Sequence, residues 1–115
     1  FRKLENETTL QMLKKNNSVI SLGGGAFLNK SIRLSVKKKC ISFWLDIDVE
    51  QLVKRLKKSK KRPLLYNKDI NVTIRKLYLE RKKIYNEADY RVNCSYLKSY
   101  EVINKIIKLY EKSRT

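Results

Sequence analysis

The sequence predicts an α/β fold in which parallel strands form a sheet with helices on both faces. Short apolar runs, rich in β-branched and aromatic residues, alternate three times with segments of helical periodicity. The candidate strands cover residues 18–22, 40–45 and 90–94. A sheet of three strands is small for a complete domain. The chain therefore fits half of a doubly wound domain better than a whole one. At 115 residues the chain is one small domain.

The first half of the chain carries two of these strands. Residues 1–15 are expected to form a helix or the end of one, because apolar side chains recur among polar neighbours. Ser18–Leu22 is a β-branched run that stops at the glycines 23–25, which predicts a strand leading into a loop of unusual backbone. Residues 26–38 are expected to be a short helix or irregular. Cys40–Leu45 is continuously apolar, which is typical of a strand buried on both faces.

The second half is mainly helical. Asp48 is expected to cap a helix, with Gln51 at the capping-box position. Apolar residues between positions 49 and 56 follow the i, i+3, i+4, i+7 spacing of one buried helix face. Residues 70–88 form the longest periodic segment, and Ser99 is expected to open a final helix.

The composition excludes several kinds of protein. The absence of histidine excludes Ser-His-Asp and Cys-His nucleophiles and His-ligated metals. Cys40 and Cys94 lie far apart without CxxC spacing, which argues against a disulfide framework or a zinc site and favours a reduced, cytoplasmic setting. No apolar run approaches the roughly 18 residues of a membrane helix, and no signal or transit peptide pattern opens the chain. Because Phe1 is large and removal of an initiator Met usually requires a small second residue, we expect that residues are missing upstream.

The chain is strongly basic, with 28 Lys and Arg against 11 Asp and Glu and a net charge of +17. Two explanations are open. An AT-rich genome biases the composition toward Lys, whereas a phosphate-rich partner requires positive charge. On charge alone we favour the bias from the genome. The basic run 54–62 is interpreted as a solvated helix end, a phosphate-binding lid or a nucleic-acid patch, although it contains no aromatic residue. Arg2 and Glu5, three residues apart on a predicted helix, can pair, at first sight as a solvated surface pair.

Two features point to a ligand site. Gly23, Gly24 and Gly25 follow a predicted strand, and ligands of open α/β sheets bind at the carboxyl ends of strands. A plain tight turn is the alternative, and we favour the functional interpretation. Arg81 falls within the apolar stripe of the 70–88 helix, where a charge needs a partner. That partner is either a structural acid or a ligand carboxylate held by two hydrogen bonds.

Five segments, in this order and spacing, make the chain resemble shikimate kinase, a small P-loop kinase of the nucleoside monophosphate kinase type. They are FRKLE at 1–5, VISLGGGAF at 19–27, FWLDI at 43–47, KRPLL at 61–65 and ERKKIYNEADYRV at 80–92. Each alone is weak, but together they are specific and span essentially the whole chain. The resemblance implies a three-layer fold with a parallel sheet. It also implies ATP-dependent phosphorylation of the 3-hydroxyl of shikimate, a step toward aromatic amino acids.

The resemblance further implies roles for single residues. Arg2 and Arg81 match the arginines that bind the shikimate carboxylate in the family, and Glu5 matches the acid that positions the first of them. The glycines 23–25 match the loop that lines the shikimate pocket.

Two further arginines are implied to lie near the nucleotide. Arg62 matches the lid arginine that closes onto the ATP phosphates, and Arg55 matches an arginine near the nucleotide. Residues 57–69 have the basic, polar composition of such a lid, whose closure excludes water that would compete as acceptor. The implied partners are therefore shikimate and ATP with Mg²⁺, without nucleic acid or membrane, in a protein that is a monomer when complete.

The chain departs from the family because no G-x-x-x-x-G-K-[ST] occurs in it. The phosphate-binding Lys, the Ser/Thr that holds Mg²⁺ and the Asp that contacts the reacting hydroxyl are absent, so this chain holds no catalytic or metal-binding residue. The family places them upstream, in on the order of 50 residues. We therefore expect the C-terminal portion of one kinase domain, inactive alone, with exposed sheet edges or an uncovered apolar face that promote aggregation or poor order.

Three other hypotheses stay open. One is an inactive, kinase-like relic that binds an anion without transferring phosphate. Another is a small basic nucleic-acid-binding protein, which no RRM, KH or zinc-finger motif supports and whose binding would weaken steeply with salt. The third is gluconate kinase, which shares the architecture. The FR-x-x-E motif, the three glycines and the spacing of Arg81 and Tyr85 favour shikimate kinase over gluconate kinase.

Overall fold

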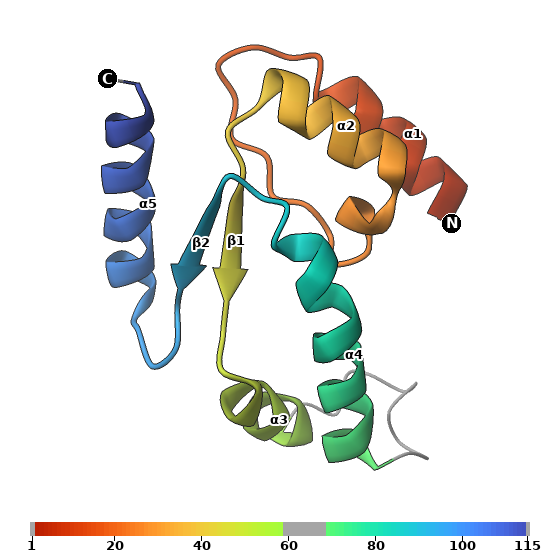
Figure 1. Cartoon of the computed structure of the whole chain (residues 1–115), viewed down its shortest axis with the longest axis vertical. Coiled ribbons are helices and arrows are strands. Elements are labelled where there is room, and N and C mark those ends of the chain that lie inside the picture. Colours follow the sequence, from red (N-terminus) through yellow and green to blue (C-terminus); the bar gives the residue numbers. More distant parts are fainter. Residues whose placement is uncertain (1, 59–68, 115) are drawn as a thin grey trace.

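The computed structural model describes residues 2–58 and 69–114, which form an α/β fold with parallel strands (Figure 1). Its elements in chain order are α1 (Arg2–Met12), the 3₁₀ turn η1 (Ala26–Leu28), α2 (Lys30–Lys39), β1 (Phe43–Asp46), α3 (Val49–Lys58), α4 (Ile70–Tyr85), β2 (Tyr90–Asn93) and α5 (Ser99–Ser113). The helices predicted within 1–15 and 70–88 and from Ser99 are confirmed. Within the described ranges, no helix is both long and apolar enough to cross a membrane.

The two strands pair in parallel, with Phe43 opposite Tyr90 and Asp46 opposite Asn93. Helices α3 and α4 lie between them in the chain and form the crossover that parallel neighbours require. In Figure 1, α5 lies beside β2, whereas α4 lies on the β1 side. This arrangement confirms the parallel α/β class that the sequence predicts.

The first predicted strand, Ser18–Leu22, is not formed, so the described residues build a sheet of two strands rather than three. A strand exists only through hydrogen bonds to a neighbour, and no backbone hydrogen bond joins residues 18–22 to β1 or β2. Val19 is fully exposed, whereas Ile20 and Leu22 pack against the core. The run therefore supplies core side chains without joining a ladder.

Strand β1 is buried on one face only, against the prediction of burial on both. Trp44 is buried against α4, but the next residue, Leu45, is 52% exposed. Helix α5 packs against β2, where Val92 is buried, and leaves the neighbouring Leu45 of β1 half exposed. Ile103 and Ile107 of α5 are exposed as well. The expectation of an uncovered apolar face is thus confirmed, whereas aggregation stays a prediction.

The start of α3 is tied to the loop after β2. Asp48 caps the helix as predicted, since its Oδ1 accepts the N–H of Glu50 at 3.3 Å. The N–H of Asp48 donates to Ser95 Oγ at 2.8 Å. The predicted capping box is wrong, because Oε1 of Gln51 accepts the N–H of Tyr96 at 2.9 Å instead. The side chain of Gln51 therefore binds a residue 45 positions away in the sequence instead of capping its own helix.

The core that positions the candidate site lies between α1, η1, α2 and α4. Its buried members are Leu13, Ala26, Phe27, Ile32 and Val36, with Leu10, Ile20, Leu22, Cys40, Ile84 and Tyr85 packed against them. Fully burying one large apolar side chain stabilises a fold by about 1.5–3 kcal/mol. Because the cluster takes residues from both flanks of the glycines 23–25 and from α4, it holds α1, the glycines and α4 close together.

Candidate functional site

Three consecutive glycines, 23–25, form the loop between the 18–22 segment and η1. None has a positive φ, so the predicted unusual backbone is not what requires glycine here. Their carbonyl groups accept hydrogen bonds from the N–H groups of Ala26 and Leu28 and from the hydroxyl of Tyr85. Their own N–H groups have no acceptor in the described part of the chain. These three donors are available to a ligand.

The loop requires glycine because side chains lie directly against it. A Cβ atom at Gly25 would lie 1.9 Å from Nη1 of Arg2, and one at Gly24 would lie 3.3 Å from Nη1 of Arg81. Neighbouring Cα atoms are only about 3.8 Å apart. Guanidinium groups from α1 and α4, far apart in the sequence, therefore approach adjacent residues of one loop.

Arg2 is held beside the loop by Glu5. Nη1 of Arg2 donates to Oε1 of Glu5 at 3.1 Å, which confirms the predicted pairing. A Cβ atom at Gly23 would lie 3.1 Å from the other carboxylate oxygen, Oε2 of Glu5, so this acid also lies against the loop. An exposed pair of this kind stabilises a fold by only about 0–1 kcal/mol. Its main consequence is the placement of the guanidinium group.

Arg81 lies half-buried in the apolar stripe of α4, as predicted. Within residues 2–58 and 69–114, no carboxylate or carbonyl accepts a hydrogen bond from its guanidinium group. Of the two partners that the sequence predicts for Arg81, the structural acid is therefore not found in the described ranges. The ligand carboxylate, the other predicted partner of Arg81, stays a prediction.

Together these groups have the chemistry of a site for a small hydroxylated anion. Each guanidinium group presents a planar set of N–H donors that matches the two oxygens of a carboxylate. The glycine N–H groups can donate to further ligand oxygens, and the absence of Cβ atoms allows a close approach. Arg2 and Arg81 place positive charge beside the glycine loop. Among the described residues, the acid that lies directly against this loop is Glu5.

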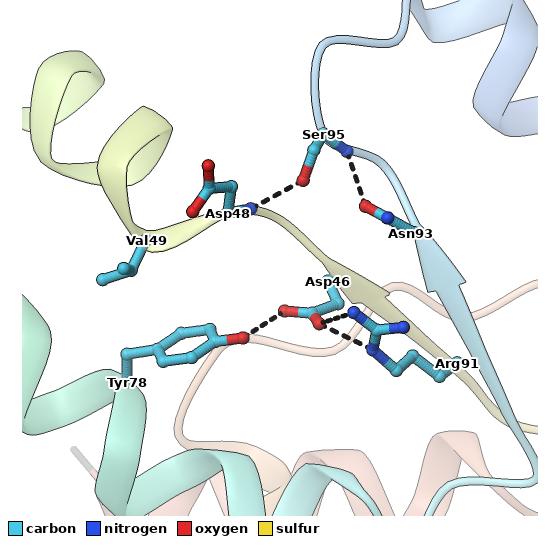
Figure 2. A pocket seen from close by; sticks show the side chains of 7 residues that line it. All are labelled: Asp46, Asp48, Val49, Tyr78, Arg91, Asn93 and Ser95. Carbon is cyan, nitrogen blue, oxygen red and sulfur yellow. Dashed lines mark hydrogen bonds and ion pairs between the residues drawn. The ribbon is translucent and has the colours of Figure 1, made fainter.

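A second polar cluster lies at the carboxyl ends of β1 and β2 (Figure 2). Asp46 is 3% exposed, and its Oδ1 accepts the hydroxyl of Tyr78 at 3.0 Å. Its Oδ2 accepts a hydrogen bond from Nε of Arg91 at 2.7 Å and forms an ion pair with Nη2 of Arg91, also at 2.7 Å. Burial, and then the hydrogen bond to Asp46, raise the pKa of Tyr78, so its hydroxyl remains a donor at neutral pH. The adjoining cavity has a volume of about 450 Å³ and is lined by Asp46, Asp48, Val49, Tyr78, Arg91, Asn93 and Ser95.

Sequence reasoning did not single out this second cluster. The available signal was Asp46 itself, an acid at the end of an apolar strand, where a buried charge must be paired. Its partners Tyr78 and Arg91 lie 32 and 45 residues further along the chain. Nothing local in the sequence identifies them as partners, because the pairing follows from the crossover between the strands.

The nucleotide side of the predicted site is only partly described. Arg55 is exposed in the last turn of α3. Arg62 and residues 59–68 of the predicted lid, 57–69, lie outside the described residues. Within the described ranges, no group of three or more Cys, Asp or Glu side chains could hold a metal ion.

The comparisons with known proteins agree on one family. The family model described as shikimate kinase matches residues 1–111. The shikimate kinase of Bartonella quintana (strain Toulouse) is 36% identical over 108 residues, which are 94% of this chain and 51% of that protein. The shikimate kinase of Bartonella henselae is 39% identical over 81% of this chain and 44% of its own length. The shikimate kinase of Caldanaerobacter subterraneus is 35% identical over 97% of this chain and 66% of its own length. The chain spans about half the length of the first two relatives.

A solved structure shows the same fold. A crystal structure of shikimate kinase from Bacteroides thetaiotaomicron superposes with a TM-score of 0.80 at 24% sequence identity, covering 99% of this chain and 68% of that one. This likeness confirms the P-loop kinase fold of the nucleoside monophosphate kinase type, of which the described residues supply two strands rather than the predicted three. Since the family model extends over nearly the whole sequence, the chain belongs to the shikimate kinase family.

Proposed function

We propose that this chain carries the shikimate-binding part of a shikimate kinase, which phosphorylates the 3-hydroxyl of shikimate with ATP. One observation carries the proposal: Arg2, Glu5 and Arg81, from two helices, all lie against the glycines 23–25. The family resemblance implies these same residues for shikimate, and the family match supports that substrate.

In this proposal the two arginines hold the substrate carboxylate. Arg81 has no acceptor in the described ranges, and Arg2 donates from one nitrogen to Glu5, which leaves other guanidinium donors for the ligand. The N–H groups of the glycines 23–25 donate to hydroxyl oxygens on the ring of the substrate. Phosphoryl transfer depends mainly on positioning and on neutralising charge. Fixing the carboxylate thus fixes where the reacting hydroxyl lies.

ATP is the second substrate in this proposal. Arg55 and Arg62 are proposed to contact the nucleotide, Arg62 as part of a lid over residues 57–69. The sequence contains no G-x-x-x-x-G-K-[ST], so no step of phosphoryl transfer is assigned to this chain. We expect the 115-residue chain to bind shikimate without turning over ATP. Shikimate-dependent ADP release by the purified chain would contradict that expectation.

The test is a calorimetric titration of the 115-residue chain with shikimate. Arg2→Ala should weaken binding about ten-fold or more, since a charge-assisted hydrogen bond is worth about 1.5–3 kcal/mol. Arg75→Ala is the matched control, because this arginine of α4 pairs with Glu50 of α3 and not with the glycine loop. It should leave the affinity unchanged. Absence of saturable binding, or an equal loss in both variants, would refute the proposed function.

A further inference from the structure

The glycine loop is held at its middle residue by a side chain rather than by the backbone. The carbonyl groups of Gly23 and Gly25 accept N–H groups of the turn that follows them. The carbonyl group of Gly24 accepts the hydroxyl of Tyr85, at the end of α4. Tyr85 therefore fastens the centre of the loop to the helix that carries Arg81.

A hydrogen bond to the Gly24 carbonyl also sets the direction of the next N–H. The Gly24 C=O and the Gly25 N–H belong to one planar trans peptide unit and point in opposite directions. Glycine populates both halves of the φ range, so a peptide between two glycines can rotate as a unit where nothing holds it. Because Tyr85 holds the carbonyl, the Gly25 N–H points away from Tyr85.

The hydroxyl of Tyr85 is itself fixed in space. Its ring centroid lies 6.4 Å from that of Phe27 in η1 and 6.2 Å from that of Trp44 in β1, both in tilted contact. Arg81 lies one turn earlier on the same helix, with its Nη1 3.3 Å from where a Cβ of Gly24 would be. One helix thus places both the loop peptide and the guanidinium group beside it.

We propose that Tyr85 is a positioning residue of the substrate site. It holds the Gly24–Gly25 peptide in the orientation that lets the Gly25 N–H donate to a ligand oxygen while Arg81 binds the carboxylate. Tyr85 acts through the loop and not by contact with the reacting atoms. The proposal rests on the proposed function, because its ligand is shikimate.

The loop can be observed without any ligand, because the sequence contains three glycines and all of them lie in it. Selective ¹⁵N-glycine labelling should give three amide signals, one for each loop residue. Tyr85→Phe keeps the ring and removes the hydroxyl. It should displace and broaden the Gly25 signal most.

Tyr78→Phe is the matched control. It removes a phenol hydroxyl from the same helix, but that hydroxyl donates to Asp46 and not to the loop. It lowers stability without touching the glycines, so the three signals should stay in place. Equal displacement in both variants, or none in Tyr85→Phe, would overturn the proposal.

The shikimate affinity provides the second readout. Loss of one hydrogen bond that orders a donor should weaken binding about three- to ten-fold in Tyr85→Phe, and Tyr78→Phe should not weaken it. Displaced glycine signals with unchanged affinity would overturn the positioning role and leave the proposed function standing. If the unmutated chain binds no shikimate, the proposed function fails, whereas the glycine signals still report whether Tyr85 orders the loop.

A measurement on the unmutated chain covers the case in which Tyr85→Phe does not fold. With ¹³C-carbonyl glycine, the Gly24 carbonyl should resonate downfield of its position in the urea-unfolded chain, as a hydrogen-bonded carbonyl does. A Gly24 carbonyl at its unfolded position would show that the hydroxyl of Tyr85 does not hold it, and would refute the proposal.

Discussion

The two polar clusters of this chain use the same kinds of residue but differ in what remains unpaired. At the end of β1, the buried carboxylate of Asp46 accepts one hydrogen bond from Tyr78 and one from Nε of Arg91, and it forms an ion pair with Nη2 of Arg91. At the glycine loop, Arg81 has no acceptor in the described ranges and three N–H groups are unpaired. A paired cluster stabilises the fold, whereas unpaired donors that converge on one place are suited to a ligand.

The comparison predicts that substitutions in the two clusters affect different properties. Changes at the Asp46 cluster should lower the free energy of unfolding and leave the ligand affinity of the folded chain unchanged. Changes at the glycine loop should lower the ligand affinity and leave the free energy of unfolding nearly unchanged. The following substitutions test this separation, from the largest expected effect to the smallest.

Asp46→Ala should have the largest effect on stability. It removes the carboxylate that holds Tyr78 of α4 and Arg91 of β2. Breaking a buried charge pair costs about 3–5 kcal/mol, and we expect the lower end because the side chain of Arg91 is 51% exposed. Urea denaturation followed by circular dichroism measures the loss. A change below about 1 kcal/mol would show that the cluster does not hold the strands and α4 together.

Arg81→Ala should have the largest effect on binding. Loss of charge-assisted hydrogen bonds worth about 1.5–3 kcal/mol predicts a shikimate affinity lower by about ten- to a hundred-fold. The free energy of unfolding should change by less than about 0.5 kcal/mol, because no described residue pairs with this guanidinium. Arg81→Lys should restore part of the affinity, since an ammonium group keeps the charge without the two-pronged geometry. A loss of stability without a loss of affinity would assign Arg81 to the fold instead.

Gly25→Ala should weaken binding through Arg2. Its Cβ would lie 1.9 Å from Nη1 of Arg2, and the end of this flexible side chain can move away while the backbone keeps a negative φ. We expect an affinity lower by roughly ten-fold, the value of about one charge-assisted hydrogen bond, with little change in melting temperature. Gly23→Ala is the milder comparison, because its Cβ would lie 3.1 Å from Oε2 of Glu5. Equal losses in the two variants would argue against displacement of Arg2.

The smallest effect concerns alkaline pH and the Asp46 cluster. Burial and the bond to Asp46 raise the pKa of Tyr78 above its ordinary value of 10.0. The neutral phenol is thus favoured by folding, so its contribution to stability is complete below pH 10.0 and lost as the pH rises through the higher, folded-state pKa. Denaturation midpoints between pH 9 and 11 should fall more steeply in the unmutated chain than in Tyr78→Phe. Identical slopes would contradict the raised pKa.

Predictions from the sequence succeeded where the information is local or forms an ordered set of motifs. The helical period of 70–88 matches α4, and Arg81 lies half-buried on that helix as its place in the apolar stripe predicts. The strand predicted at Ser18–Leu22 failed because a strand depends on a hydrogen-bonded neighbour, which its own residues do not specify. The capping box at Gln51 failed because the distant N–H of Tyr96 is its donor.

The candidate site shows the same division. Arg2, Glu5 and the glycines 23–25 could be predicted as site residues because their motifs are contiguous. That Gly25 faces Arg2 while Gly24 faces Arg81 could not, since this follows from how α1 and α4 pack on the core. The Asp46 cluster could not be predicted either, because its three members come from three separate elements.

The central claim is that shikimate binds at the glycine loop, with its carboxylate held by Arg2 and Arg81. The most direct measurement is a titration of the ¹⁵N-glycine-labelled chain with shikimate and, separately, with its neutral carboxamide analogue. The account predicts saturable shifts of all three glycine signals with shikimate and weak shifts with the carboxamide. In Arg81→Ala, the same shifts should need about ten- to a hundred-fold more shikimate. Glycine signals that do not move at saturating shikimate, or that move equally with the carboxamide, would contradict it.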